Sequence, residues 1–248
     1  MTLPADPALW VALVGGGRYL AIAGLLFLLC RAGLGHPVAG HAGEADRWQI
    51  GREIGCSLAM VGLLVLINGV LMFQCGLLQA SRLYWHIAER GLPWFLLSIP
   101  VVLLLQDTLF YWTHRALHTR WLFRRVHRVH HASVHPTAWA AYSFHPVEAA
   151  VEILLVTSIV FLVPVHPLAM AVAQTLSMLF NAYGHCGREF LPPRARRWLN
   201  TSTAHSAHHR VGHGNYGLYL RFWDEAMGTT VPVVAGPDGP NRPSPQPA

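Results

Sequence analysis

The sequence contains no lysine, and charged residues make up only 12% of its 248 residues. A soluble globular domain has about 25% charged residues. This shortage, together with 53% apolar residues, excludes an ordinary soluble domain and indicates a membrane protein. All 18 basic residues are arginines and the net charge is +6, which suits anionic lipid headgroups or an acidic protein partner. Aromatic and basic residues do not alternate outside the segments that flank the apolar runs, so nucleic acid is not a predicted partner.

The sequence also lacks a CxxC pair and a basic N-terminal signal. The first ten residues, MTLPADPALW, contain an acid and no basic residue. A cleaved signal peptide is therefore not expected, and the first apolar run is predicted to stay in the membrane. The cysteines lie within or beside apolar runs, which predicts free thiols rather than disulfides or metal ligands. They are Cys30, Cys56, Cys75 and Cys186.

Five apolar runs are candidates for transmembrane helices, which need about 20 predominantly apolar residues. The prolines of VPVHP favour a tight turn between the fourth and fifth runs, so these two are predicted to form a tilted hairpin. The expected fold is all-α and integral to the membrane, with about four to five transmembrane helices. One domain is expected over residues 1–230, followed by a disordered Pro/Gly-rich tail at 231–248. The runs cover approximately residues 9–30, 54–78, 92–112, 147–163 and 168–182.

Histidine-rich segments follow the third and fifth apolar runs and recur in the polar C-terminal third. Because a hairpin returns the chain to the side that it left, these segments are predicted to share one face, as a helical cap. Arginines are dense there, so the positive-inside rule places the cap in the cytoplasm. In a bacterium, the membrane would be the inner (plasma) membrane. The arginines are Arg115, Arg120, Arg124, Arg125, Arg128, Arg188, Arg194, Arg196, Arg197 and Arg210.

Three histidine motifs have the spacing of metal ligands. HRALH at 114 places two histidines one helical turn apart, and HRVHH at 127 and HSAHH at 205 share the spacing i, i+3, i+4, which predicts one helix face for each. Neutral imidazole binds iron, zinc and copper. The alternative, imidazoles that contact lipid phosphates beside the arginines, does not explain the repeated spacing. With the histidine of NAYGH, nine residues are predicted to supply four or five ligands to each of two metal ions: His114, His118, His127, His130, His131, His185, His205, His208 and His209.

A few further polar residues are candidates for the site. Asp107 lies two helical turns before His114 on the same face, and an aspartate in an apolar run is costly unless it is paired or functional. It is predicted either to accept a hydrogen bond from a ligand histidine or to form a salt bridge with an arginine of the cap. Glu148 and Glu152 have the same two interpretations. His145, in FHPVE, is either a catalytic-site residue or a hydrogen-bonded structural residue. The histidines not predicted as ligands are His36, His41, His86, His135, His166 and His213.

Seven motifs, in this order, resemble the fatty acid hydroxylase/sterol desaturase superfamily: HRALH at 114, HRVHH at 127, FHPVE at 144, NAYGH at 181, HSAHH at 205, NYG at 215 and WDEAMGT at 223. The resemblance covers residues 106–230. It implies an integral-membrane oxygenase with about four spans under a cytoplasmic cap, and a di-iron centre held by the nine histidines. Some members have a second histidine four residues before the position of His185. Asn181 stands there, where it can bind a metal, hold a water or pack against a helix.

The resemblance also implies dioxygen as co-substrate and electrons from a cytochrome b5-like or ferredoxin-like donor. The expected reaction is hydroxylation or desaturation of a lipid-like substrate such as a fatty acyl chain, a sterol or another isoprenoid. Arginines around the cap can bind an acidic headgroup or an acidic donor. Zinc is expected as a substitute for iron in purified protein. The rival interpretation is a metal-binding membrane transporter. A transporter requires polar or charged residues along several spans, whereas the predicted spans of this sequence contain few of them. A structural or lipid-surface protein would bind no stoichiometric metal.

Overall fold

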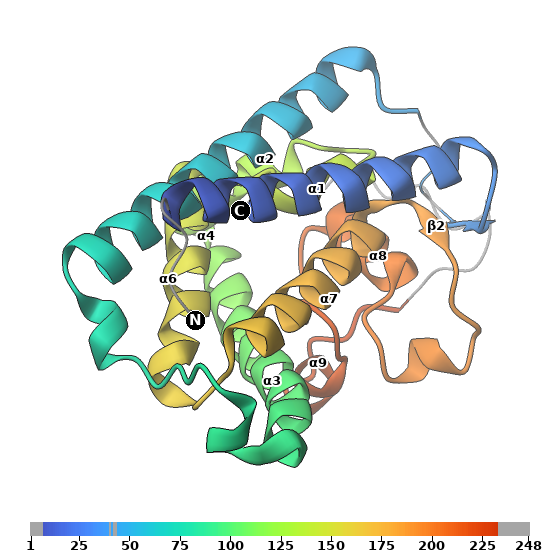
Figure 1. Cartoon of the computed structure of the whole chain (residues 1–248). Helices are drawn as coiled ribbons and strands as arrows, with labels where there is room; N and C mark the ends of the chain where they lie inside the picture. The colour runs from blue at the N-terminus through green and yellow to red at the C-terminus, as the bar shows by residue number, and fades with distance from the viewer. Residues whose placement is uncertain (1–6, 40, 42–43, 233–248) are drawn as a thin grey trace.

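Five apolar helices form the body of the computed structural model (Figure 1). The structure describes residues 7–39, 41 and 44–232, so the predicted Pro/Gly-rich tail from residue 233 onward lies outside the described residues. Each helix corresponds to one predicted apolar run, although α2 ends before its run does, and the third and fifth helices extend beyond their runs into histidine motifs. The helices are α1 (Pro7–Arg31), α2 (Arg47–Asn68), α3 (Gly91–Leu117), α6 (Pro146–Leu162) and α7 (Pro167–His185).

Polar side chains mark where three of these helices begin. Asp46 caps α2 by accepting a hydrogen bond from the Gln49 backbone N–H at 2.7 Å. His145 and His166 cap α6 and α7 in the same way through Nδ1, and a proline follows each of them. Proline suits the first helical position because its φ angle is already helical and its missing N–H is not needed there. The two His-Pro pairs therefore begin the fourth and fifth apolar helices.

Among the described residues, three helical stretches are long and apolar enough to cross a membrane: Ala12–Arg31, Arg47–Gln74 and Gly91–Leu117. The second includes a π-helical segment, η1 (Gly69–Gln74), that continues α2. Large apolar side chains on these helices face outward; Leu28 and Leu66 are each more than 60% exposed, as expected of side chains that contact lipid. α6 and α7 are shorter, with 17 and 19 residues. The predicted all-α membrane fold is confirmed, and the four cysteines are free thiols.

α6 and α7, which the sequence predicted as a tilted hairpin, follow one another through a short turn at residues 163–166. α3 packs against both of them, and its buried Val102 joins Ile159 of α6 and Ala173 of α7 in one apolar cluster. The two helices therefore diverge from the turn at residues 163–166. α1 lies across α2 and α7 (Figure 1) and is held there by the Tyr19 hydroxyl, which donates to the Trp139 carbonyl.

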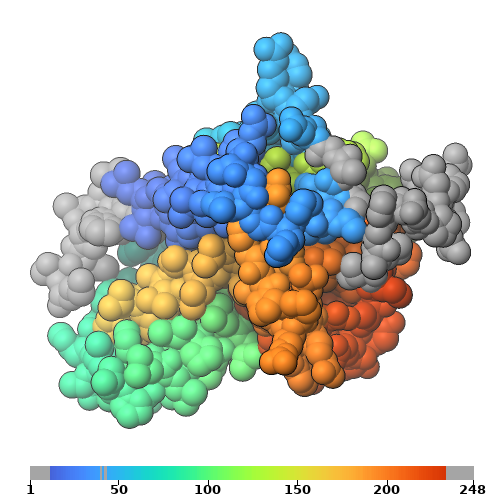
Figure 2. All heavy atoms as spheres, turned by 90° about the vertical axis from the view of Figure 1, so that its right-hand side faces the viewer, coloured from blue at the N-terminus to red at the C-terminus, as the bar shows by residue number. Residues whose placement is uncertain are grey.

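Short segments build a polar cap around the C-terminal ends of α3 and α7. The loop between α1 and α2 is tied to this cap because β1 (His36–Pro37) pairs antiparallel with β2 (Arg188–Glu189). In Figure 2 the orange segment that follows α7 lies on the surface directly below the blue segment that leads into β1. Two short helices, η2 (Leu77–Ala80) and η3 (Ile87–Glu89), precede α3 at its other end. The remaining cap segments are α4 (Arg120–Leu122), η4 (Phe123–His127), α5 (Arg128–His131), η5 (Ala138–Tyr142), η6 (Ala195–Arg197), α8 (Ser202–Val211) and α9 (Phe222–Ala226).

Candidate metal centre

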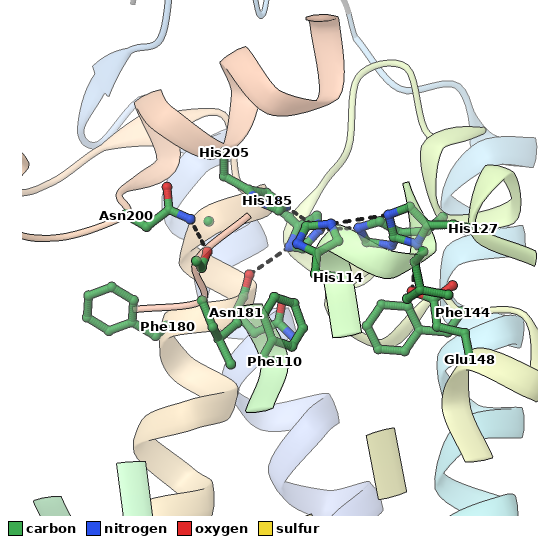
Figure 3. A pocket seen from close by; sticks show the side chains of 15 residues that line it. Phe110, His114, His127, Phe144, Glu148, Phe180, Asn181, His185, Asn200 and His205 are labelled. Atoms are coloured by element: carbon green, nitrogen blue, oxygen red, sulfur yellow. Dashed lines mark hydrogen bonds and ion pairs between the residues drawn. The ribbon is translucent and has the colours of Figure 1, made fainter. Parts of the chain in front are cut away.

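The structure brings all nine predicted histidines together in two adjacent groups. They come from the end of α3, the segment 120–131, the end of α7 and α8. Within each group, one ring nitrogen of every residue lies within 4.8 Å of the others, so each group can hold a metal ion. In Figure 3 the labelled imidazoles of His114, His127, His185 and His205 point toward one another. The first His group is His114, His118, His127, His131 and His208, and the second His group is His130, His185, His205 and His209.

Each HxxHH motif contributes histidines to both groups. His127 and His131 belong to the first group and His130 to the second. In α8 the assignment is reversed, with His208 in the first group and the other two histidines in the second. Positions i+3 and i+4 point in directions about 100° apart around a helix axis, so an HxxHH motif can supply two neighbouring centres. The spacing predicted one helix face for each motif, and that face serves two neighbouring groups.

In four of these histidines, Nδ1 is fixed by a backbone carbonyl. Nδ1 of His118, His208 and His114 donates to the carbonyls of residues 212, 214 and 216 at 2.9, 2.6 and 2.9 Å. In the second group, His185 Nδ1 donates to its own helix at Asn181, at 2.7 Å. Because a carbonyl can only accept, Nδ1 carries the proton in each case and Nε2 keeps its lone pair. The tautomer that binds a metal through Nε2 is thus set by the fold.

The Nε2 atoms, which point into the two groups, lie so close together that a bound cation is needed to offset the repulsion between them. Nε2 of His114 lies 3.2 Å from Nε2 of His127. In the second group, Nε2 of His185 lies 2.9 Å from that of His205 and 3.1 Å from that of His130. Two lone pairs at such distances repel one another unless a cation attracts both. Nε2 of His118, His131 and His208 is buried without any hydrogen-bond partner. A set of neutral nitrogen donors of this kind suits a transition-metal ion.

Burial keeps these imidazoles neutral. Desolvation, followed by the neighbouring imidazoles, lowers the pKa of His127, His130 and His131 well below 6.5. Desolvation likewise lowers the pKa of His205, His208 and His209. Metal ions bind the neutral form of imidazole. Near neutral pH the histidines of both groups are therefore in the form that binds metal.

Glu148 is the carboxylate that contacts a candidate ligand directly. Its Oε1 accepts a hydrogen bond from His127 Nδ1 at 2.8 Å, and both side chains are almost fully buried. Figure 3 shows Glu148 next to His127, on the side away from the other imidazoles. A carboxylate in this position fixes the tautomer of the ligand and raises its basicity. Of the two interpretations of Glu148, the structure has the histidine contact rather than a salt bridge to arginine.

Asp107 neither contacts a ligand histidine nor forms a salt bridge with an arginine, the two roles predicted for it; it binds the backbone instead. Its Oδ1 accepts hydrogen bonds from the backbone N–H groups of residues 218, 219 and 220, at 3.2, 2.7 and 3.3 Å. Asp224, from the WDEAMGT motif, accepts from those of residues 216 and 217. Five consecutive N–H groups are therefore bound by two buried carboxylates. Asp107 acts on the ligands indirectly, by holding the loop whose carbonyls orient the first His group.

The same loop explains the NYG motif. Gly214 has a φ of +71°, and a Cβ there would lie 2.5 Å from the Thr229 carbonyl oxygen. Asn215 is left-handed as well, with a φ of 49°. Its side chain donates to the Ala204 carbonyl of α8 and accepts from the Val231 N–H. These residues shape a loop that crosses the first His group with its carbonyls pointing inward.

Glu189 holds the start of α8, and no motif in the sequence indicated this role. This buried carboxylate of β2 accepts hydrogen bonds from the Thr201 and Thr203 hydroxyls at 2.8 and 2.6 Å, and also from the Tyr183 hydroxyl. Thr201 is the residue that precedes the first turn of α8. The contact fixes the helix that supplies three of the nine histidines.

Asn181 and His145 lie outside both His groups. Asn181 Nδ2 donates to the Ala141 carbonyl at 2.8 Å, and its own carbonyl accepts from His185. Its side chain lines the space below the histidines (Figure 3). His145 caps α6, which matches the structural interpretation of this residue.

Two spaces adjoin the histidines. A small one, about 20 Å³, lies among His114, His127, His185 and His205 and has room for a water-sized molecule. A larger cavity of about 450 Å³ lies between α1, α2, α3, α6 and α7. The two share Phe110, Phe144, Asn181 and Leu218 as lining residues. The larger cavity is lined mainly by apolar side chains and ends directly below the histidines, so it can guide a hydrocarbon to them.

Comparison with known proteins gives a consistent result. Lathosterol oxidase of Mus musculus is 32% identical over 183 residues, which cover 73% of this chain and 61% of that protein. Lathosterol oxidase of Homo sapiens is 28% identical with the same coverage. A Delta(7)-sterol 5(6)-desaturase of Gibberella zeae is 29% identical over 182 residues, 73% of this chain and 56% of that protein. The chain thus spans less than two thirds of the length of these curated relatives. No solved structure matches it. Residues 99–229 match the fatty acid hydroxylase family, and the chain belongs to that family.

Proposed function

We propose that this protein is a membrane-bound di-iron oxidoreductase that uses dioxygen to hydroxylate or desaturate a lipid-like substrate. The main support is the pair of His groups, in which several histidines are held in the tautomer that leaves Nε2 free to bind metal, at the end of an apolar cavity. The relatives named lathosterol oxidase and sterol desaturase support a lipid substrate with a sterol or other isoprenoid skeleton. Two bound irons would supply the electrons that reduce dioxygen, which gives the oxidising power to attack an unactivated C–H bond.

The chain's own residues would prepare this chemistry. The nine histidines would hold the two irons, and Glu148 would keep His127 in the ligating tautomer. Phe110 and Phe144 would position the hydrocarbon where the cavity meets the histidines. Asn181 would line the reaction space, where its Nδ2 donates to the Ala141 carbonyl. Asp107 and His145 would act structurally.

Electrons would reach the irons through the arginine-rich surface of the cap. Arg120 and Arg128 are exposed on the segment that also provides three of the histidines, and the Arg125 guanidinium lies over the Trp121 ring at 5.0 Å. A positive surface so close to the metal site suits an acidic donor of the ferredoxin or cytochrome b5 type. This cap would face the cytoplasm, in keeping with the positive-inside rule. We expect electron transfer from such a donor to slow as ionic strength rises.

Metal analysis of the purified protein tests the ligand assignment. We expect about two equivalents of iron, or of zinc acquired during purification. The neighbouring residues His130 and His131 make a matched pair because they belong to different groups. Their single alanine variants should each lose one metal, and the double variant should lose both. A metal content unchanged in all three variants would refute the proposed centre.

The reaction itself is tested on lipids. Lipid extracts from cells with and without the protein are compared by mass spectrometry. A product heavier by one oxygen atom indicates hydroxylation, and one lighter by two hydrogen atoms indicates desaturation. Both outcomes begin with the same hydrogen abstraction, and the names of the relatives favour desaturation. Identical extracts from cells that contain the metal-loaded protein and an acidic electron donor would contradict the proposal.

A further inference from the structure

The large cavity contains an unpartnered carboxyl group. Glu152, on α6, lines the cavity, is only 9% exposed, and has an Oε1 with no hydrogen-bond partner. Other polar side chains in the wall bind each other: Gln106 donates to Ser177 and accepts from Gln174. An ionisable group buried in an apolar space is costly unless it has a partner or a function. Glu152 therefore offers a hydrogen-bonding position that the protein itself does not fill.

The position of Glu152 along the cavity relates it to the histidines. It lies one helical turn, about 6 Å, from Glu148, which contacts His127. The rest of the cavity extends away from the histidines, along α7 from Asn181 to Pro167, a helical rise of about 21 Å. Its far end is lined by apolar side chains such as Leu83 and Met170. The cavity thus has a polar group near the histidines and apolar walls at its far end. A substrate with one polar end and a long hydrocarbon body fits this cavity if its polar end lies at Glu152.

We propose that Glu152 binds a hydroxyl group of the substrate, so that the substrate is a neutral lipid alcohol with its hydroxyl end near the histidines. This inference rests on the proposed function, because it places the oxidised C–H bond a few bonds from that hydroxyl. A hydroxyl can donate to a carboxylate or accept from a carboxylic acid. An acidic headgroup would instead meet two carboxyl groups, Glu148 and Glu152, each with an unpartnered oxygen. Ligand cavities of this size commonly use a few polar groups to fix the ligand's orientation.

Arg18 is the other residue that could bind the polar end of the substrate, and it would favour a different class of substrate. It lines the cavity from α1, its guanidinium contacts the Tyr142 hydroxyl, and its Nε is unpartnered. A lipid acid would bind there, whereas an alcohol would bind at Glu152. The two anchors lie on different helices, so separate variants distinguish them.

Binding measurements with purified, metal-loaded protein test the proposal. The probes are lathosterol, farnesol and hexadecanol, each compared with the hydrocarbon that lacks its hydroxyl group, and palmitate as the acid. The unmodified protein should bind at least one alcohol about tenfold or more tightly than its hydrocarbon, as expected of a hydrogen bond to a buried carboxyl group. Glu152→Met should abolish this preference, and Glu152→Gln, which still hydrogen-bonds, should retain it. Val156→Ala, at another position in the same wall, should weaken alcohol and hydrocarbon equally.

Two results would overturn the proposal. One is that no alcohol binds more tightly than its hydrocarbon, or that Glu152→Met keeps the preference. The other is that palmitate binds most tightly and loses its affinity in Arg18→Met but not in Glu152→Met, which would identify a lipid acid. Metal content and dioxygen consumption are measured on the same samples. If the protein prefers alcohols but binds no metal, the proposed oxygenase function is refuted and the hydroxyl site is supported. If the protein binds metal but shows no preference for alcohols, the hydroxyl site is refuted and the oxygenase function is not.

Discussion

Replacing Glu148 with glutamine is expected to weaken metal binding in the first His group and leave the second group unchanged. Glu148 Oε1 accepts from His127 Nδ1 at 2.8 Å in a buried contact. Glutamine has the same shape and keeps an acceptor oxygen, so the ring orientation should persist. What is lost is the negative charge that makes the imidazole a stronger donor to the metal. Loss of such a partner lowers metal affinity about 10- to 100-fold, which corresponds to about 1.4–2.7 kcal/mol.

The assay is a chelator competition on purified protein that contains two metals. In Glu148→Gln, one metal should leave at a chelator concentration about 10- to 100-fold lower than in the unmodified protein, and the other at the same concentration. Glu152→Gln is the matched control, because it makes the same change one turn along α6 without any hydrogen bond to a histidine. The reasoning is refuted if Glu148→Gln shifts both metals equally or neither, or if the control shifts one of them.

Three further substitutions have defined outcomes. His145→Ala removes the cap of α6 and should lower the free energy of unfolding by about 1 kcal/mol with the metal content unchanged; lost metal would instead indicate a role in the site. Asp107→Asn weakens the acceptor of three backbone N–H groups. It should cost about 1–3 kcal/mol in chemical denaturation and reduce metal in the first His group, whereas unchanged stability would contradict the role given to this carboxylate. Burial opposes the ionisation of Glu189, but hydrogen bonds from threonine and tyrosine hydroxyls outweigh it and hold its pKa below 4.5. Because the folded-state pKa is the lower one, the carboxylate stabilises the fold above about pH 4.5, and this contribution is lost as the pH falls through the folded-state pKa. The difference in thermal stability between the unmodified protein and Glu189→Gln should therefore shrink below about pH 4.5, and a constant difference would argue against it.

The helices and the identity of the site residues follow from local sequence. Apolar runs of sufficient length predicted all five apolar helices, because burying such a run in lipid requires a helix to satisfy its backbone. The HRALH motif, the two HxxHH motifs and the histidine of NAYGH predicted the nine histidines that the fold brings together. His145 shows the limit of this approach: the sequence left a catalytic and a structural interpretation open, and only the contact with the Val147 N–H makes it a helix cap.

What the sequence determined by itself is a set of short-range properties: which segments are helical, which are apolar, and which histidines lie one turn apart. The tertiary structure decided how those histidines divide into two groups, because that depends on the directions in which facing helices are turned. It also decided the partners of the ring nitrogens. The acceptors at residues 212, 214 and 216 are backbone carbonyls about ninety to one hundred residues from two of the histidines that they orient. Every residue has a backbone carbonyl, so the residue type does not show which carbonyls accept a hydrogen bond from a ligand histidine. The folded loop, held by Asp107 and Asp224, brings these carbonyls to the histidines.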